Sequence, residues 1–304
     1  MWQTLVKNIP TKRESLFSPL SIQVVLALVY FGAKGNTAKE LERGLHLPSD
    51  KMVTDNGINA LVHRLNESEN VLLDIANKIY LLHGFEIKKE FRQTADGFLA
   101  GVEQLNFGDS EQSRKTINDW IEDKTHGRIK DIIGKDTLDT YTLMVIVNAI
   151  YFKGEWHRVF SEDTTKPAPF HLPSGTTEDV DMMFIEDYFS YADVNELNSQ
   201  ALMLPYKGCR QNMIILLPKK VDGLQYLERN LDRFDPMEVV KRMTSILTGM
   251  KNAKFIPDVS VLVGGGLGGF PPIVFKADHP YTFFIVDDFT KTVLFAGRLA
   301  SPSM

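Results

Sequence analysis

The sequence is poor in cysteine and in clustered positive charge. Its single cysteine, Cys209, offers neither an intramolecular disulfide nor the ligand spacing of a cysteine-based metal site. No run of five or more lysines or arginines occurs, and 34 basic against 39 acidic residues give a formal net charge of −5. We therefore expect no nucleic-acid partner. The redox compartment stays open, because a large core needs no disulfides.

Long hydrophobic runs are also missing. The longest apolar stretches, Val24–Phe31 and Met213–Leu217, are far shorter than the ~20 residues of a membrane-spanning helix, so no membrane partner is expected. The first ten residues lack the basic start, apolar middle and small-residue cleavage site of a secretory signal. The composition, 43% hydrophobic and 24% charged, is that of a globular protein with a substantial core.

The motifs of common enzymes are absent or out of context. The sequence has no G-x-S-x-G, no H-E-x-x-H and no histidine pair at i, i+4. Residues 264–269 formally satisfy G-x-G-x-x-G, but Phe270-Pro271-Pro272 follows and cannot open the helix that a dinucleotide site needs. Cys209 is more simply a bystander thiol than a nucleophile, although a cysteine hydrolase stays as a third hypothesis. We expect no enzymatic activity, no cofactor and no metal site.

Hydrophobic periodicity predicts helices in the first half of the chain and strands in the second. Expected helices are 19–31, 36–47, 51–66, 87–99, 110–133, 222–230 and 235–245. Expected strands are 71–82, 142–156, 168–172, 180–192, 200–206, 211–217, 273–276, 281–286 and 291–299. Three details can be checked: Thr37 caps the second helix, Met52 faces inward, and Ile129 shares an apolar face with Trp120. The order predicts an α+β fold.

Six segments together resemble the serpin family of serine protease inhibitors. They are collinear and span nearly the whole chain: Leu16–Ile22 (LFSPLSI), Tyr30–Thr37 (YFGAKGNT), Asn148–Trp156 (NAIYFKGEW), Leu204–Tyr206 (LPY), Phe275–Pro280 (FKADHP) and Phe295–Pro302 (FAGRLASP). The resemblance implies one α+β domain over residues 1–304, with three β-sheets and about eight helices. It also implies a monomer whose exposed reactive loop is cut by a serine protease and then enters the central sheet.

The resemblance also assigns roles to individual residues. Ser18, Ser21 and Asn148 match the shutter, under the place where the central sheet parts, and Trp156 matches the breach, where loop insertion begins. Ser18 could equally cap a helix, and Trp156 could be an ordinary core aromatic. The strand after the reactive loop carries the remaining matched residues, Phe275, Lys276, His279 and Pro280. The family implies an extracellular inhibitor, but no export signal is visible, so a cytoplasmic location stays open. Asn66 is a glycosylation acceptor only if the chain is exported.

One interval departs from the family pattern. Residues 241–274 provide 34 positions, where two sheet strands, a helix, a hinge and a loop need ~50 or more. We therefore expect an incomplete central sheet, with 241–272 an abbreviated, glycine-rich remnant of the reactive-loop region. Residues 249–251 and 257–260 look like remnants around a later helix. Candidate bait residues are Leu262, Val263 and Leu267.

Two functions follow from this combination. The first is a serpin-type serine protease inhibitor whose trapping activity is impaired, and the alternative is a non-inhibitory serpin-like binding or storage protein. A glycosaminoglycan site is not indicated, because residues 51–66 contribute only Lys51, His63 and Arg64 as basic groups, beside Asp55 and the following Glu67.

Overall fold

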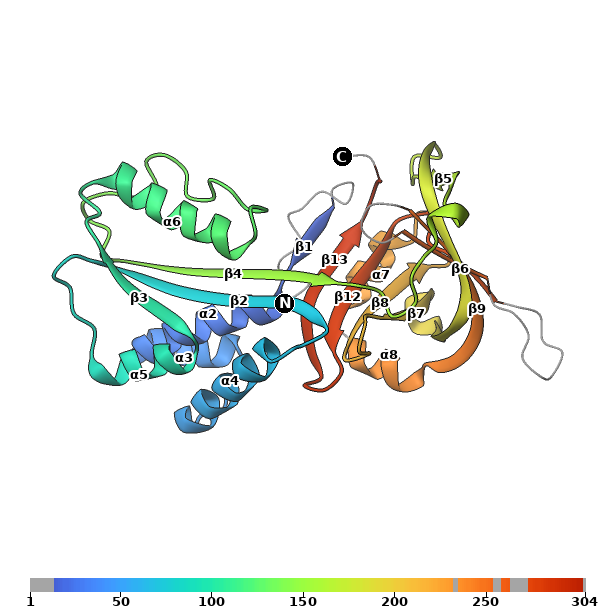
Figure 1. Ribbon diagram of the computed structural model, residues 1–304. Coiled ribbons are helices and arrows are strands. Elements are labelled where there is room, and N and C mark those ends of the chain that lie inside the picture. Colours follow the sequence, from blue (N-terminus) through green and yellow to red (C-terminus); the bar gives the residue numbers. More distant parts are fainter. Residues whose placement is uncertain (1–13, 232–234, 254–257, 263–272, 303–304) are drawn as a thin grey trace. The chain divides into compact units, whose positions relative to one another are not determined.

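The computed structural model describes residues 14–231, 235–253, 258–262 and 273–302. The chain divides into two compact units (Figure 1). One unit is Leu20–Gly154, and the other joins residues 1–19 to residues 155–304.

Five helices belong to the first part of the chain. They are α2 (Pro19–Gly32), α3 (Gly35–Gly44), α4 (Lys51–Asn66), α5 (Lys89–Gly97) and α6 (Ser110–Lys124). Helix α2 starts at a proline, whose fixed φ and missing N–H suit a first helical residue, and it ends at Gly32 as predicted. Side-chain caps begin two others: the Asp50 carboxylate accepts from Met52 N in α4 at 2.8 Å, and that of Asp109 accepts from Gln112 N in α6 at 3.2 Å.

Three local predictions are wrong. Helix α3 starts at Gly35, and its N-cap is Lys34 rather than Thr37, which lies inside the helix. Met52 is 68% exposed because the buried face of α4 carries Thr54, Val62 and Leu65, and Met52 points away from that face. Helix α6 ends at Lys124, since Gly127 adopts a left-handed φ of 76° and its N–H bonds back to Glu122 O at 2.8 Å. Ile129 therefore lies beyond the helix and is 38% exposed.

A three-stranded sheet crosses the Leu20–Gly154 unit. Its order is β3–β2–β4, with β3 (Ala100–Leu105) parallel and β4 (Met144–Gly154) antiparallel to β2 (Val71–Leu82). The alternation of apolar residues predicted a strand at 71–82, and the structure confirms both of its bounds. Helix α6 covers one face, where Ile117 and Ile121 pack in one buried cluster with Tyr80 of β2 and Val147 of β4. Both β2 and β4 are visible as long neighbouring strands in Figure 1.

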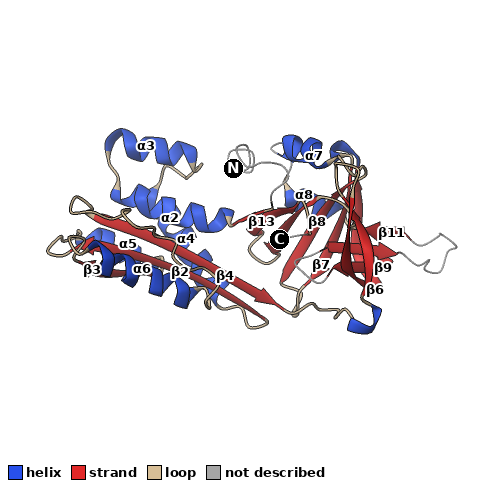
Figure 2. Cartoon of the chain, turned by 90° about the horizontal axis from the view of Figure 1, so that it is seen from above, coloured by secondary structure: helices blue, strands red, loops and turns tan. Residues whose placement is uncertain are grey.

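The second unit is built on a ten-stranded sheet that curls (Figure 2). Its main path is β1–β13–β12–β8–β7–β6–β9–β10–β11, and β5 pairs with β6. The strands are β1 (Ser15–Phe17), β5 (Lys166–His171), β6 (Thr177–Val194), β7 (Ser199–Pro205), β8 (Gln211–Pro218), β9 (Thr244–Ala253), β10 (Asp258–Leu262), β11 (Ile273–Lys276), β12 (Tyr281–Asp287) and β13 (Thr292–Leu299).

Two short helices complete this unit, α7 (Leu224–Asn230) and α8 (Pro236–Arg242), with single turns of 3₁₀ helix at Glu162–Thr164 and Asn195–Leu197. Leu227 of α7 and Val239 of α8 are fully buried in one apolar cluster with Ile214 and Leu216 of β8. Every residue of β8 and β12 is buried, which is why both strands are mainly apolar between their ends.

The α+β class is confirmed. Over the described residues the structure has seven α-helices and two hydrogen-bonded sheets, where we expected about eight helices and three sheets. Residues 249–251 and 258–260 lie in strands β9 and β10 rather than around a helix, which corrects that prediction. Strand β9 pairs with residues 182–191 of β6, so the backbone N–H and C=O groups of β9 find hydrogen-bond partners in that long strand.

Candidate functional site

Three polar side chains, the buried Ser21 and Asn77 and the half-buried Asn148, form a hydrogen-bond relay inside the Leu20–Gly154 unit. Ser21 Oγ of α2 donates to Asn148 Oδ1 of β4. Asn148 Nδ2 donates to Asn77 Oδ1 of β2 at 2.8 Å, and Asn77 Nδ2 donates to Phe98 O at 3.0 Å. Each amide both accepts and donates, so the relay joins a helix, two strands and the turn after α5.

The sheet register brings the two amides together. Asn77 and Asn148 stand directly opposite each other in the antiparallel β2–β4 pairing. Asn77 is 2% exposed and Ser21 4%, in a place where an unpaired amide or hydroxyl would be costly. The structure therefore brings Ser21 and Asn148 together as the resemblance predicted, while their role in a shutter stays a prediction. Ser18, at 6% exposed, is also buried, at the residue before α2.

Asn77 was missed by the sequence analysis although its signal is readable. The inward positions of β2 are apolar at Leu73, Ile75 and Ile79, and Asn77 is the one amide in that series. A polar residue in the apolar phase of a strand needs a buried partner. The partner could not be read from the sequence, because Asn148 lies 71 residues further along the chain.

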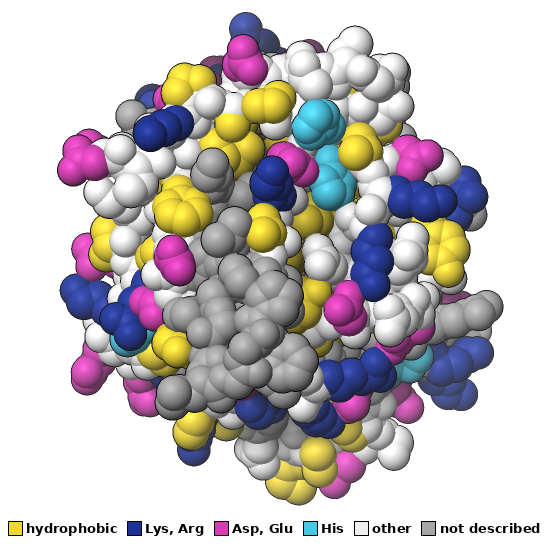
Figure 3. Space-filling model, turned by 90° about the vertical axis from the view of Figure 1, so that its right-hand side faces the viewer, with side chains coloured by type: hydrophobic (Ala, Val, Ile, Leu, Met, Phe, Trp, Pro, Cys, Tyr) yellow, Lys and Arg dark blue, Asp and Glu magenta, His cyan; other side chains and the backbone are white. Residues whose placement is uncertain are grey.

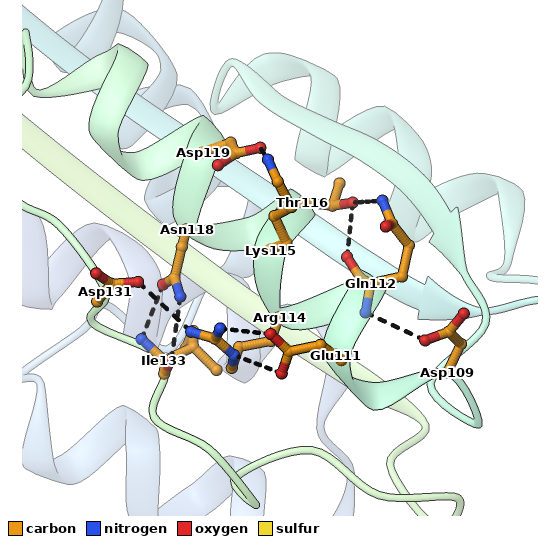
Figure 4. A network of polar contacts seen from close by, with 10 residues as sticks. All are labelled: Asp109, Glu111, Gln112, Arg114, Lys115, Thr116, Asn118, Asp119, Asp131 and Ile133. Atoms are coloured by element: carbon orange, nitrogen blue, oxygen red, sulfur yellow. Dashed lines mark hydrogen bonds and ion pairs between the residues drawn. The ribbon is translucent and has the colours of Figure 1, made fainter.

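Helix α6 is fastened to the segment that follows it, as Figure 4 shows. The Asn118 side chain holds the backbone of Ile133 by two bonds: its Nδ2 donates to Ile133 O at 3.0 Å, and its Oδ1 accepts from Ile133 N at 2.9 Å. The guanidinium of Arg114 forms a two-pronged ion pair with Glu111, at 2.7 and 3.1 Å, and reaches Asp131 at 3.4 Å. These contacts hold the returning chain against the helix that covers the sheet.

Trp156 lies in an aromatic stack in the second unit. Its ring is parallel to that of Tyr206, with centroids 4.5 Å apart, and meets Phe160 edge-on. The two backbones form a β-bridge at Trp156 and Tyr206, flanked by a bond from Lys207 N to Glu155 O at 2.8 Å. Burial raises the pKa of the Tyr206 hydroxyl. Trp156 is thus held by the end of β7, and its role in a breach stays a prediction.

The FKADHP segment is packed inside the second unit. Phe275 is fully buried, His279 is 9% exposed, Pro280 is buried and Lys276 is exposed. His279 Nε2 lies 2.7 Å from Pro218 O at the end of β8, and its Nδ1 lies 2.9 Å from Asp278 Oδ1. The residues after β11 are therefore tied to the end of a core strand.

The candidate bait residues are placed only in part. The backbone of Leu262 ends strand β10, whereas Val263 and Leu267 lie outside the described residues, as does the glycine run at 264–269. Asn66 is the last residue of α4 and is exposed, so its amide is accessible as a glycan acceptor. Cys209 is an exposed free thiol in the turn between β7 and β8.

Other kinds of site find no support in the part of the chain that the structure describes. No three His, Cys, Asp or Glu side chains there are grouped so that they could hold a metal ion. None of the described helices has the length and apolar character needed to span a bilayer. Of the residues that the sequence analysis singled out, Ser21 and Asn148 are joined directly by a side-chain hydrogen bond.

One unit has a three-stranded sheet with helices packed on it, and the other has a large curled sheet; this combination defines an α+β protein of the serpin-like class. Solved structures share this fold: a cleaved serpin, titled Serpin 42Da, matches with a TM-score of 0.88 and 27% identity, covering all of this chain and 95% of its own. Uncleaved ovalbumin matches with a TM-score of 0.83 at 23% identity, over 99% of this chain and 96% of its own.

The sequence comparisons give the family. The family described as "Serpin (serine protease inhibitor)" matches residues 1–262. Leukocyte elastase inhibitor A of Mus musculus is 30% identical over 370 aligned positions, which cover 99% of this chain and 96% of the relative. An uncharacterized serpin-like protein of Thermococcus kodakarensis is 33% identical, over 94% of this chain and 80% of its own length. The chain belongs to the serpin family, whose members are generally protease inhibitors rather than enzymes.

Proposed function

We propose that this chain is a serine protease inhibitor that offers a bait loop between β10 and β11 and whose ability to trap the protease is impaired. The observation that carries the proposal is family membership over nearly the whole chain, with relatives named as leukocyte elastase inhibitors. The proposed target is a serine protease, and the proposed place of action is extracellular. The proposed unit of function is a single domain of residues 1–304.

Two observations support impaired trapping. The alignment with the mouse elastase inhibitor has 370 positions against 304 residues in this chain, a difference of 66, so the relative carries that many residues or more without a counterpart here. Between α8 and β11 the described strands β9 and β10 pair with each other, and β9 pairs with β6 of the curled sheet. In this arrangement they add nothing to the sheet of β2 and β4.

The shutter role of the relay belongs to the same proposal. A sheet that admits a new strand beside β4 must exchange hydrogen bonds under that strand. Ser21, Asn148 and Asn77 provide donors and acceptors that can be re-paired without leaving a buried polar group alone. We place Trp156 at the start of such an opening, because it follows β4 directly and is anchored on Tyr206.

The test is to mix the full chain with trypsin-, chymotrypsin- and elastase-like proteases and to follow both cleavage and conjugate formation. The expected result is a cut within residues 258–276, mapped by mass spectrometry, without a conjugate that survives denaturing electrophoresis. A conjugate formed at near one-to-one stoichiometry would refute the impairment. The same proteases with the catalytic serine replaced by alanine provide the matched control, since they can bind the loop but cannot acylate.

The alternative is a non-inhibitory binding protein, and one observation favours it. A cavity of ≈ 570 Å³ opens between β2, β3 and the carboxyl end of α6, with Lys78, Trp120 and His126 among its lining residues. This volume is within the range of small-molecule sites in proteins. A ligand recovered with the purified chain, together with no cleavage and no inhibition in every protease assay, would favour this function over the first.

A further inference from the structure

Among the described residues, strand β4 has a strand partner along one edge only. Its eleven residues, Met144–Gly154, pair with β2 through an unbroken register. On the other edge, no strand among the described residues pairs with it. An edge of this kind presents a row of backbone N–H and C=O groups that can template another strand.

The opposite edge of the same sheet is protected, and β4 is not. Strand β3 has only six residues, contains Gly101, and carries Glu103 in an ion pair with Lys78 at 2.7 Å. Short length, glycine and charge all discourage strand addition. Strand β4 is nearly twice as long and has no proline, no interior glycine and a single charge, Lys153. Most of its side chains are only half-buried.

The sequence of β4 is suited to pairing with itself. Two copies related by a two-fold axis through Ala149 would align all eleven residues in an antiparallel ladder, and any other two-fold register aligns fewer. Opposite residues then share a face. Val147 stands opposite Tyr151 on the face that α6 covers, and Ile146 stands opposite Phe152 on the other. Pairs of an aromatic and a β-branched residue are favourable across strands.

The charges also agree with this register. Lys153 of one copy stands opposite Val145 of the other, so no two charges of like sign meet. At a rise of ~3.4 Å per residue, the two Lys153 side chains lie ~27 Å apart, far beyond a contact. An isologous two-fold pairing is also closed, because it consumes both free edges and leaves no β4 edge for a third copy.

We propose that a second copy of this chain occupies the free edge of β4, so that two β4 strands pair about Ala149 and the two sheets join as β3–β2–β4–β4–β2–β3. This interface goes beyond the proposed inhibitory function. It uses the edge of β4 beside which that function admits a new strand, so a paired second copy would block the insertion. It differs from the monomer that the family resemblance implies, because its cause is an edge that the described strands leave open.

The experiment is sedimentation of the full chain from about 1 to about 200 μM, a span that detects micromolar association. A monomer–dimer equilibrium that moves toward dimer with concentration is expected, and a monomer throughout would overturn the proposal. Hydrogen exchange gives an independent reading on the unaltered protein. Amides of 144–154 should exchange more slowly at the high concentration, whereas those of β3 should not change. Equal exchange in β4 at both concentrations would overturn the proposal.

Charge variants test the register. Val145→Lys places a lysine opposite Lys153 of the partner copy, and Val145→Glu places a carboxylate there; both put a charge at the same site, so their effects on folding are matched. The dissociation constant should differ by about tenfold or more between them, with Val145→Glu the tighter dimer. Adding Lys153→Glu to Val145→Lys should restore tight association. A dimer that is indifferent to these charges uses another surface and refutes this one.

Discussion

Replacing Asn148 by alanine is the sharpest test of the polar relay. The substitution removes the acceptor of the Ser21 hydroxyl and the donor to Asn77 Oδ1. Each buried polar atom left without a partner costs about 1–3 kcal/mol. Asn77 is 2% exposed and its Oδ1 loses its donor, so this loss alone predicts a decrease of about 1–3 kcal/mol in the free energy of unfolding.

The relay further predicts coupling between the two amides. With Asn148 already gone, Asn77→Ala removes a side chain that has lost one of its two partners, so the double variant should cost about 1 kcal/mol less than the sum of the single ones. Asn118→Ala is the matched control. It deletes another buried amide of the same unit, which binds the backbone of Ile133 instead of the relay. Its effect should add to that of Asn77→Ala without coupling.

The assay is urea unfolding followed by circular dichroism, with hydrogen exchange in β2 and β4 as a local readout. An Asn148→Ala variant within about 0.5 kcal/mol of the parent would show that water replaces the relay, and would refute the reasoning. So would a coupling between Asn77 and Asn148 no larger than that between Asn77 and Asn118.

Two further predictions concern the second unit. Arg298 is fully buried, and its Nη1 lies 3.0 Å from both carboxylate oxygens of Glu228. Replacing Arg298 by methionine (Arg298→Met) should lower the free energy of unfolding in urea at neutral pH by about 3–5 kcal/mol. Adding Glu228→Leu to this variant should recover most of that loss. Burial raises the pKa of Glu228 although Arg298 opposes it, so the stability from this carboxyl is present below its unfolded pKa near 4.5 and is lost as pH rises through the folded pKa. Unfolding measured from about pH 5 to pH 8 should fall more steeply for Arg298→Met, and a parallel curve would contradict this origin. For Trp156→Leu and Tyr206→Leu, a double-mutant cycle in thermal unfolding should give about 0.5–1.5 kcal/mol of coupling from the ring stack, and an additive result would show that stacking contributes nothing.

Where a pattern is governed by neighbouring residues, the sequence predicted the structure well. The helix at 51–66 and the strand at 71–82 have the predicted bounds, because side-chain periodicity of 3.6 and 2 is set locally. The end of α6 was misplaced by nine residues, although Gly127 marks it. Apolar residues beyond that glycine continued the helical period by chance and concealed the stop signal.

Strands β9 and β10 show the opposite situation. Their sequence has mixed polarity and no clear period, and 249–251 were interpreted as the surroundings of a helix. What places them in a sheet is β6, an 18-residue strand whose residues 182–191 pair with β9. A strand that forms because a neighbouring strand pairs with it cannot be predicted from its own residues alone.

The sequence by itself determined the α+β class, the family pattern and the positions where polar residues interrupt apolar ones. It also led to the prediction of a shortage of residues between 241 and 274, because the length of an interval can be counted in the chain alone. Only the tertiary structure showed that Asn77 completes the relay of Ser21 and Asn148, since the partner of a buried amide is set by sheet register across many residues. It also showed that no described strand pairs with the second edge of β4, because the pairing of a strand depends on which elements lie beside it.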